Sequence, residues 1–324
     1  MWRALFSDRN TPLRALERRE DLVQAVASKQ GALWLDLDNP APEEIALLSE
    51  VFKLDPLAVE DIVDEIHHPK VDDYSDYIYL SVHGVRPGTE RGDLQTCELD
   101  VVLSSHWLIT HGAPGMRSIG ETWDRALKVK SLPGGTPAET LQTILATQAS
   151  HHVDEVENLQ KDLATIEGEL TETGPGDRTP ARRVFRIKAD LARLRLILGA
   201  QREVVHRLGR GDFEVIPKKL YMSFRDVYDD LYRAAEMTDL LRDIAHSAVE
   251  THLNLVANRT NEIMKVLTVI TCVILPMTLI TGWYGMNFRN LAALEWRYPE
   301  LWVFGMFVVV TAGFAWFLRR KSWI

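Results

Sequence analysis

The sequence predicts an α+β protein: a cytoplasmic α/β domain, then a long helical stalk, then two transmembrane helices. Three observations lead to this architecture. Short β-rich runs alternate with helical segments over the first 132 residues. The 58 residues from Lys218 to Leu275 contain neither glycine nor proline, as expected of one long helix. Two uncharged apolar stretches then follow near the C-terminus.

Composition excludes several classes of protein. The chain has 324 residues and a formal net charge of −9, and its Lys and Arg residues form no basic block beside aromatics, so nucleic acid is not an expected partner. Its two cysteines, Cys97 and Cys272, lie far apart, which argues against a disulfide scaffold or a structural zinc site. The first sixteen residues contain no apolar run of signal-peptide length. Most of the protein is therefore expected in the cytoplasm.

The first domain is expected to span residues 1–132. Its β-rich runs are ALWLDL (32–37), YIYLSVHGV (77–85), CELDVVLS (97–104) and HWLITHG (106–112), and PEEIALLSEVF (42–52) is helical in pattern. The domain is expected to end at the Gly/Pro cluster LPGGTP.

A helical hairpin is expected over residues 133–217. Thr136, Pro137 and Glu139 form a capping box with proline at the first helical position. GPGD (174–177) breaks the first helix, and a second runs from about Thr179 to Leu208. The first helix is acidic and the second basic, so the two are expected to pair as antiparallel partners rather than to bind a ligand.

The stalk is assigned to residues 218–265, and it runs directly into an uncharged span over 266–284. A second span covers 301–318, and each approaches the roughly 20 residues needed to cross a bilayer. Cations precede the first span and follow the second, so the positive-inside rule places both termini in the cytoplasm. The loop 285–300 is then external, and the tail 319–324 is cytoplasmic. The expected location is a cell (inner) membrane, with lipid as a partner.

A heptad stripe runs along the end of the stalk and the first span. Asn261, Thr268 and Leu275 are seven apart, as are Met264, Thr271 and Thr278. One interpretation is that each threonine hydroxyl bonds to its own i−4 carbonyl, which is common in membrane helices. The other, which the single face favours, is that the stripe lines a wet lumen. Two spans cannot enclose a lumen, so the second interpretation requires a homo-oligomer with first spans inside and second spans outside.

At this point the chain resembles a known family. TNEIMKVLTVITCVILPMTLITGWYGMNF (260–288) is similar to the pore helix and signature loop of the CorA family of divalent-cation channels. WLDLDNPAPEEI, LDPLAVEDI, HPKVDDYSDYIYL, FRDVYDD and RRKSWI match further family segments in order. The resemblance implies a homopentamer that mediates influx of hydrated Mg2+, with Co2+ or Ni2+ as alternatives. It implies no cofactor other than transported and regulatory Mg2+.

The resemblance also assigns residues. The selectivity ring is Asn287, supported by Gly285 and Met286. The basic ring at the cytoplasmic mouth is Arg319, Arg320 and Lys321. The pore-lining positions are Asn261, Met264, Leu267, Thr271, Leu275 and Thr278.

An asparagine ring suits this cargo. Mg2+ releases its waters reluctantly, so neutral side-chain carbonyls that accept hydrogen bonds from the water shell bind it weakly enough for release. The loop departs from the family pattern, because Arg289 stands where an acidic residue is common and LAAL (291–294) replaces Met-Pro-Glu-Leu. A ZntB-like transporter that moves Zn2+ with protons therefore remains an alternative.

A regulatory cation site is also expected. Asp226, in FRDVYDD, matches the stalk carboxylate that binds Mg2+ between subunits, and Asp229 and Asp230 follow it. The family partner falls near Gly88, with Glu90 close by. Cytoplasmic Mg2+ bound here would hold the channel closed.

Other functions are less favoured. A membrane-anchored sensor or scaffold that conducts nothing would need neither the threonine stripe nor the signature loop. The sequence lacks the phosphate-binding, nucleophile-elbow and zinc-protease motifs of common enzymes, so no enzyme is expected. The pairs His67–His68 and His151–His152 are not expected to chelate a metal, because adjacent helical side chains point about 100° apart.

Overall fold

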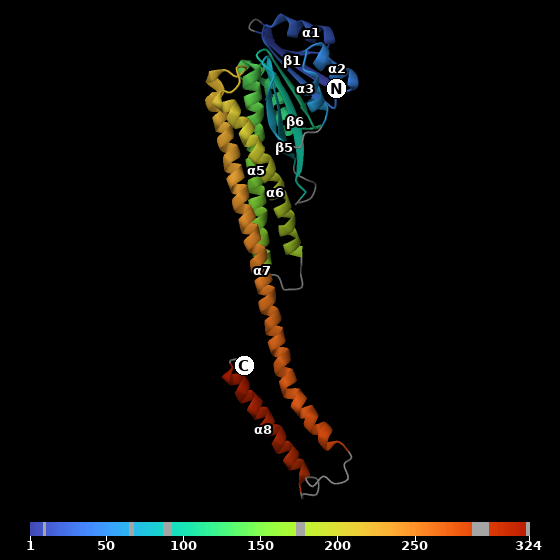
Figure 1. Cartoon of the computed structure of the whole chain (residues 1–324), viewed down its shortest axis with the longest axis vertical. Coiled ribbons are helices and arrows are strands. Elements are labelled where there is room, and N and C mark those ends of the chain that lie inside the picture. Colours follow the sequence, from blue (N-terminus) through green and yellow to red (C-terminus); the bar gives the residue numbers. More distant parts are fainter. Residues whose placement is uncertain (9–10, 65–67, 87–92, 173–178, 287–297, 322–324) are drawn as a thin grey trace. The chain divides into compact units, whose positions relative to one another are not determined.

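The computed structural model describes residues 1–8, 11–64, 68–86, 93–172, 179–286 and 298–321. The chain divides into two compact units, and the boundary falls between Val249 and Glu250, within the long helix α7 (Tyr221–Tyr284). The first unit contains a mixed sheet and several helices, whereas the second contains the end of α7 and the helix α8 (Figure 1).

The sheet has seven strands in the order β2-β1-β3-β7-β6-β5-β4. Only β3 and β7 run parallel; every other neighbouring pair is antiparallel. The strands are β1 (Trp2–Asp8), β2 (Thr11–Leu16), β3 (Ala32–Asp38), β4 (Lys70–Asp73), β5 (Tyr77–Arg86), β6 (Gln95–Ser104) and β7 (Trp107–Gly112).

Both faces of the sheet are covered by helices, because apolar side chains alternate along the strands and fill two cores. Leu33, Leu35 and Leu37 of β3 point to one core, whereas Trp34 points to the other. The first core contains α1 (Arg19–Ser28), α2 (Pro42–Glu50) and α3 (Pro56–Val63). The second contains α4 (Arg117–Val129), α5 (Pro137–Glu172), α6 (Thr179–Arg210) and the first part of α7.

The α+β architecture and the long helix expected from the sequence are therefore present. The sheet is larger than the four β-rich runs indicated, since β1, β2 and β4 were not assigned. Short 3-10 turns at Pro133–Gly135 and Lys218–Leu220 precede α5 and α7.

The start of α5 is fixed by its cap. The backbone N–H of Glu139 donates to Thr136 Oγ1 at 3.3 Å, and that hydroxyl donates to Glu139 Oε2 at 2.8 Å. Glu139 also accepts from Lys219 Nζ at 2.6 Å, which ties the start of α5 to the turn before α7. The cap therefore anchors two long helices rather than one.

The cations of α6 contact more than the acidic helix α5. Arg183 of α6 does contact Glu169 of α5, at 2.5 Å. Other cations of α6 have different partners, however: Arg195 pairs with Asp239 of α7 at 3.0 Å, and Arg193 and Arg207 donate to strand or loop carbonyls.

Arg193 and Arg207 belong to a row of polar side chains on α6, here called the polar seam, that bonds to backbone groups at one edge of the sheet. β4 pairs with β5 only as far as Ser81, and beyond it the N–H of His83 donates to Gln201 Oε1 of α6 at 3.1 Å. Asp190 accepts the N–H of Leu94 at 3.1 Å, and Arg193 donates to the carbonyl of the same residue at 2.9 Å. Arg207 donates to Val71 O on β4 at 3.0 Å. Helix α6 thus supplies the partners that a further strand would have given.

A buried polar network fastens the middle of the sheet. Trp34 Nε1 donates to Thr110 Oγ1 at 3.1 Å, and the Thr110 hydroxyl donates to Asp36 Oδ1 at 2.6 Å. Arg3 donates to the other carboxylate oxygen at 2.8 Å, and its guanidinium lies 4.2 Å from the ring centre of Trp123. Burial raises the pKa of Asp36, and these hydrogen bonds oppose that rise.

Candidate functional site: the membrane helices

The end of α7 and the helix α8 (Pro299–Arg320) are long and apolar enough to cross a membrane. In each, only 6% of the most apolar 18-residue window is buried. A core helix of a soluble protein would be largely buried. The exposure of both helices therefore indicates surfaces that face lipid or other copies of the chain.

Partly buried residues follow one face of each helix. Between residues 261 and 283 of α7 they are 265, 268, 269, 272, 273, 276, 277 and 280, and on α8 they are 303, 306, 307, 310, 311, 314 and 318. Ile280 and Leu318 are the most buried of these. This three-to-four spacing is that of two helices packed along complementary apolar stripes. The other positions of α7 between 261 and 279 are exposed.

All six positions expected to line a pore lie on that exposed part. Asn261, Met264, Leu267, Thr271, Leu275 and Thr278 are each exposed in the single chain. At 3.6 residues per turn they are centred about 140° around the helix from the partly buried face. Thr268, which shares their heptad pattern, lies at the border and is half-buried. The neighbouring exposed strip, Ile263, Val266, Ile270 and Ile274, is purely aliphatic.

The threonine hydroxyls bond within their own helix. Thr268 donates to Met264 O at 2.7 Å, Thr271 to Leu267 O at 2.8 Å, and Thr278 to Ile274 O at 2.9 Å. This is the i−4 bonding considered from the sequence. It does not separate the two interpretations, because each hydroxyl oxygen still has lone pairs that can accept from water.

The end of α7 explains the glycine of the signature. The helix ends at Tyr284, and Gly285 N donates to Thr281 O at 2.8 Å. A Cβ at Gly285 would lie 2.9 Å from that same oxygen, so a larger residue would displace the turn. Met286 is exposed, and its N–H lies 3.4 Å from Trp283 O. Asn287, the expected selectivity residue, lies outside the described residues.

Pro276 interrupts the hydrogen bonding of α7 without ending the helix. It cannot donate to Cys272 O, so this carbonyl has no i+4 donor. Such a carbonyl can be satisfied by water or by a neighbouring helix.

The predicted basic ring lies at the end of α8. Arg319 and Arg320 are in its last turn, and Lys321 N donates to Phe317 O at 3.2 Å. The Arg320 guanidinium lies 5.6 Å from the ring centre of Trp316, a cation–aromatic pair typical of a membrane–water interface.

The expected regulatory carboxylates are only partly brought together. Asp226 and Asp229 are exposed on α7, and Asp230 lies on the same face as Asp226 but pairs with Arg233 at 3.3 Å. Glu90 lies outside the described residues. No group of three or more His, Cys, Asp or Glu side chains placed to hold a metal ion is found in the described part of the chain.

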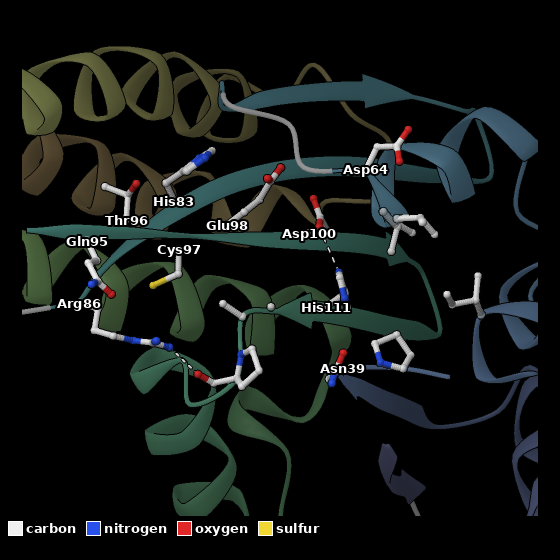
Figure 2. Close-up of a pocket in the computed structure, with 17 residues that line it drawn as sticks. Asn39, Asp64, His83, Arg86, Gln95, Thr96, Cys97, Glu98, Asp100 and His111 are labelled. Carbon is white, nitrogen blue, oxygen red and sulfur yellow. Dashed lines mark hydrogen bonds and ion pairs between the residues drawn. The ribbon is translucent and has the colours of Figure 1, made fainter. Parts of the chain in front are cut away.

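A separate pocket of about 560 Å3 lies on the sheet of the first unit (Figure 2). Two of its carboxylates have internal partners: Asp100 accepts from Tyr79 at 2.8 Å and contacts His111 at 3.3 Å, and Glu98 accepts from Ser81 at 2.7 Å. Burial raises the pKa of Asp100. No sequence pattern indicates this pocket, because its residues come from strands, helices and loops that only the fold brings together.

Of the histidines in the two pairs, His151 and His152 have contacts within the fold, and His68 is exposed. His151 Nε2 lies 3.2 Å from Glu121, and the fully buried His152 donates from Nδ1 to Gln148 O at 2.7 Å. His67 lies outside the described residues.

Comparison with known proteins agrees with the fold and the membrane helices. Residues 29–320 match the model of the family described as CorA-like Mg2+ transporter protein. The cobalt/magnesium transport protein CorA of Thermotoga maritima is 26% identical over 90% of this chain and 83% of its own. The zinc transport protein ZntB of Yersinia enterocolitica is 23% identical over 93% of this chain and 90% of its own.

A solved structure gives the same picture of the fold. The CorA magnesium transporter from Methanocaldococcus jannaschii has a TM-score of 0.84 and 23% identity, covering 99% of this chain and 98% of its own. Transport, rather than catalysis, describes these relatives. The chain is a member of the CorA-like Mg2+ transporter family, whose relatives carry divalent cations.

Proposed function

We propose that the chain forms a homopentameric channel for influx of Mg2+, with Co2+ or Ni2+ as further cargo, in the cell (inner) membrane. Both termini lie in the cytoplasm, and the first unit is cytoplasmic. The proposal rests on one observation, the exposure of the face of α7 that lies away from its partly buried side. That face is exposed in the single chain, and its polar residues, Asn261, Thr271 and Thr278, lie apart from the aliphatic strip beside it.

Five copies of this face around one axis would enclose a pore. Hydroxyl and amide oxygens on the stripe would accept hydrogen bonds from the water shell of the ion. Leu267 and Leu275 would form hydrophobic constrictions that close by dewetting. The aliphatic strip would pack against the neighbouring copy or lipid, and α8 would form the outer layer.

At the outer mouth, Asn287 would form the selectivity ring, with Gly285 and Met286 supporting it. The Gly285 turn supports this role, because only a residue without a Cβ fits beside Thr281 O. Arg319, Arg320 and Lys321 would surround the cytoplasmic mouth. Asp226, with Asp229, Asp230 and Glu90, would bind regulatory Mg2+ and couple cytoplasmic Mg2+ to closure.

The test compares flux through liposomes that contain wild type, Asn287→Ala or the neighbouring control Asn290→Ala. Selective Mg2+ uptake should be lost in Asn287→Ala while the oligomer remains assembled, since only the acceptors for the ion's water shell are removed. Asn290→Ala should keep uptake. Near-normal uptake by folded Asn287→Ala would remove the role of this ring.

A second candidate function is Zn2+ transport coupled to protons. The similarity to ZntB over 93% of the chain, together with Arg289 in the loop, favours it. The same liposomes, assayed with Mg2+, Co2+ and Zn2+ at two pH gradients, distinguish the two. Zn2+ flux that follows the proton gradient would support the second function, and Mg2+ flux that ignores it would support the first.

A further inference from the structure

The start of helix α4 in the first unit lacks the groups that normally complete a helix N-terminus. Its N-cap residue, Met116, offers no side-chain acceptor, and the first turn has no acidic residue. The N–H groups of Arg117, Ser118 and Ile119 have no carbonyl of their own helix to bond. The helix has 13 residues, so its aligned peptide dipoles leave a partial positive charge at this end.

A small cavity of about 50 Å3 opens at this helix start. Its lining includes Ser118 of α4, Gln148 of α5, Gly84 of β5 and Cys97 of β6. About 10–15 Å3 of such space accommodates one water molecule, so a small inorganic ion fits. Gly84 keeps the space open, because a Cβ there would lie 3.3 Å from Gln148 Nε2 and 3.6 Å from the terminal methyl of Met116.

Two buried polar side chains face this cavity without a partner among the described residues. Ser118 is 2% exposed and Gln148 is 1% exposed, yet Ser118 Oγ and both terminal atoms of the Gln148 amide lack a hydrogen bond there. Buried polar groups in folded proteins are almost always satisfied by protein, water or a bound ion. A hydroxyl and an amide NH2 directed into one space can both donate to the same acceptor.

The charges around the cavity favour an anion over water. Arg86 and Arg117 both line it, and Arg86 is held there by donating to Pro114 O (Figure 2 shows this contact). Gly115, with φ of +77°, makes the turn that brings the helix start beside Arg86. Glu121, one turn further along α4, is engaged by Arg117 at 3.5 Å and by His151 at 3.2 Å.

We propose that this niche, formed by the α4 N-terminus with Ser118, Gln148 and Gly84, binds a small inorganic anion, a halide or an oxyanion such as phosphate. Ser118 Oγ–H, the Gln148 amide NH2 and the N–H groups at the start of α4 donate to it, and the Arg86 guanidinium, whose bond to Pro114 O is to a neutral carbonyl, supplies the countercharge. The bound anion bridges α4 and α5 across the strands β5 and β6. The site is independent of the cation pathway.

The experiment measures the thermal stability of the purified full-length protein at fixed ionic strength. Sodium bromide or sodium phosphate replaces the sodium salt of a bulky organic sulfonate. The Tm of wild type should rise with bromide or phosphate, because an ion that binds the folded state stabilises it by mass action. If the Tm rises with bromide alone, the niche selects a halide; if it also rises with phosphate, the niche accepts an oxyanion as well. Either outcome supports the site.

Variants locate the effect. Ser118→Ala removes one donor that has no protein partner, so it should fold and weaken the apparent affinity at least tenfold. Gly84→Ala should do the same by filling the niche. Gly120→Ala is the matched control, because its Cβ would meet no atom within 4 Å, and it should keep the wild-type response.

Crystals soaked in bromide give the position. Anomalous density within hydrogen-bond distance of Ser118 Oγ supports the proposal. The proposal is overturned if the Tm of wild type does not change, or if Ser118→Ala responds as wild type does. It is also overturned if bromide is found on the surface and not in the niche, that is, as an adventitious ion only. None of these readouts depends on cation flux. The anion site can therefore be refuted while the proposed channel function is supported, and the channel function can be refuted while the anion site is supported.

Discussion

Replacing His152 with asparagine should remove a defined part of the acid sensitivity of the first unit. His152 is fully buried on α5, and burial lowers the pKa of its imidazole to about 4, with the nearby His151 and His83 adding to the effect. Nδ1 donates to Gln148 O at 2.7 Å, and an asparagine amide can make the same bond. The variant therefore keeps the contact and loses the titration.

The sign and size follow from the two pKa values. In the unfolded chain the imidazole takes up a proton below its ordinary pKa of about 6.5. The folded protein cannot bind that proton until about pH 4, so the free energy of unfolding falls as the pH drops through this window. Between pH 8 and pH 5 the loss from this one residue is about 2 kcal/mol. That corresponds to roughly 4–8 °C in Tm for a domain of 150–250 residues.

The assay is the Tm of the full-length protein at pH 8 and at pH 5. The decrease in Tm between these two values should be several degrees smaller in His152→Asn than in wild type, even if the variant is less stable at pH 8 because of its smaller side chain. His106→Asn, at an exposed histidine, is the control and should keep the wild-type decrease. An equal decrease in wild type and His152→Asn would refute the reasoning.

Three further predictions concern the buried polar network around Asp36, the proposed pore and the proposed regulation by cytoplasmic Mg2+. Thr110→Val should cost roughly 2–4 kcal/mol of unfolding free energy because it leaves Asp36 and Trp34 Nε1 with a buried hydrogen bond unmade, and Thr110→Ser should restore most of it in denaturant titrations. Leu267→Asn should raise basal cation flux by wetting a constriction; unchanged flux would place this position outside the pore. Asp226→Ala should leave channels open at Mg2+ levels that close wild type, and an identical Mg2+ dependence of current in both would exclude the gate.

Much of the fold could be predicted from local pattern. The apolar runs at 32–37, 77–85, 97–104 and 106–112 correspond to β3, β5, β6 and β7, and the stretch without glycine or proline corresponds to α7. β1, β2 and β4 were missed because Arg, Asp or Pro interrupts their alternation, and they are strands through their pairing with neighbours.

The charge pattern of the hairpin indicates only some of the contacts that α6 makes. Opposite charges on two helices predict pairing, but α6 also packs along the sheet, and backbone groups of β4 and β5 compete for its polar side chains. That competition depends on tertiary position, which composition does not contain. For the candidate site, helical periodicity identified a face of α7, and the single chain leaves that face exposed. What the face contacts depends on other copies, so a single-chain pattern cannot specify it.

The polar seam of α6 also bears on how copies of the chain can associate. At one end of the sheet, Arg207 and Gln201 occupy backbone groups that an incoming strand would need. At the other end, Leu13 N of β2 donates to Lys130 O at 3.4 Å, so this group is not available to an incoming strand. Assembly by strand addition, which has no natural stopping point, is thereby hindered at both edges. Any self-association would then use helical surfaces, where a fixed rotation between neighbouring copies can close a ring of finite size instead of growing a fibre.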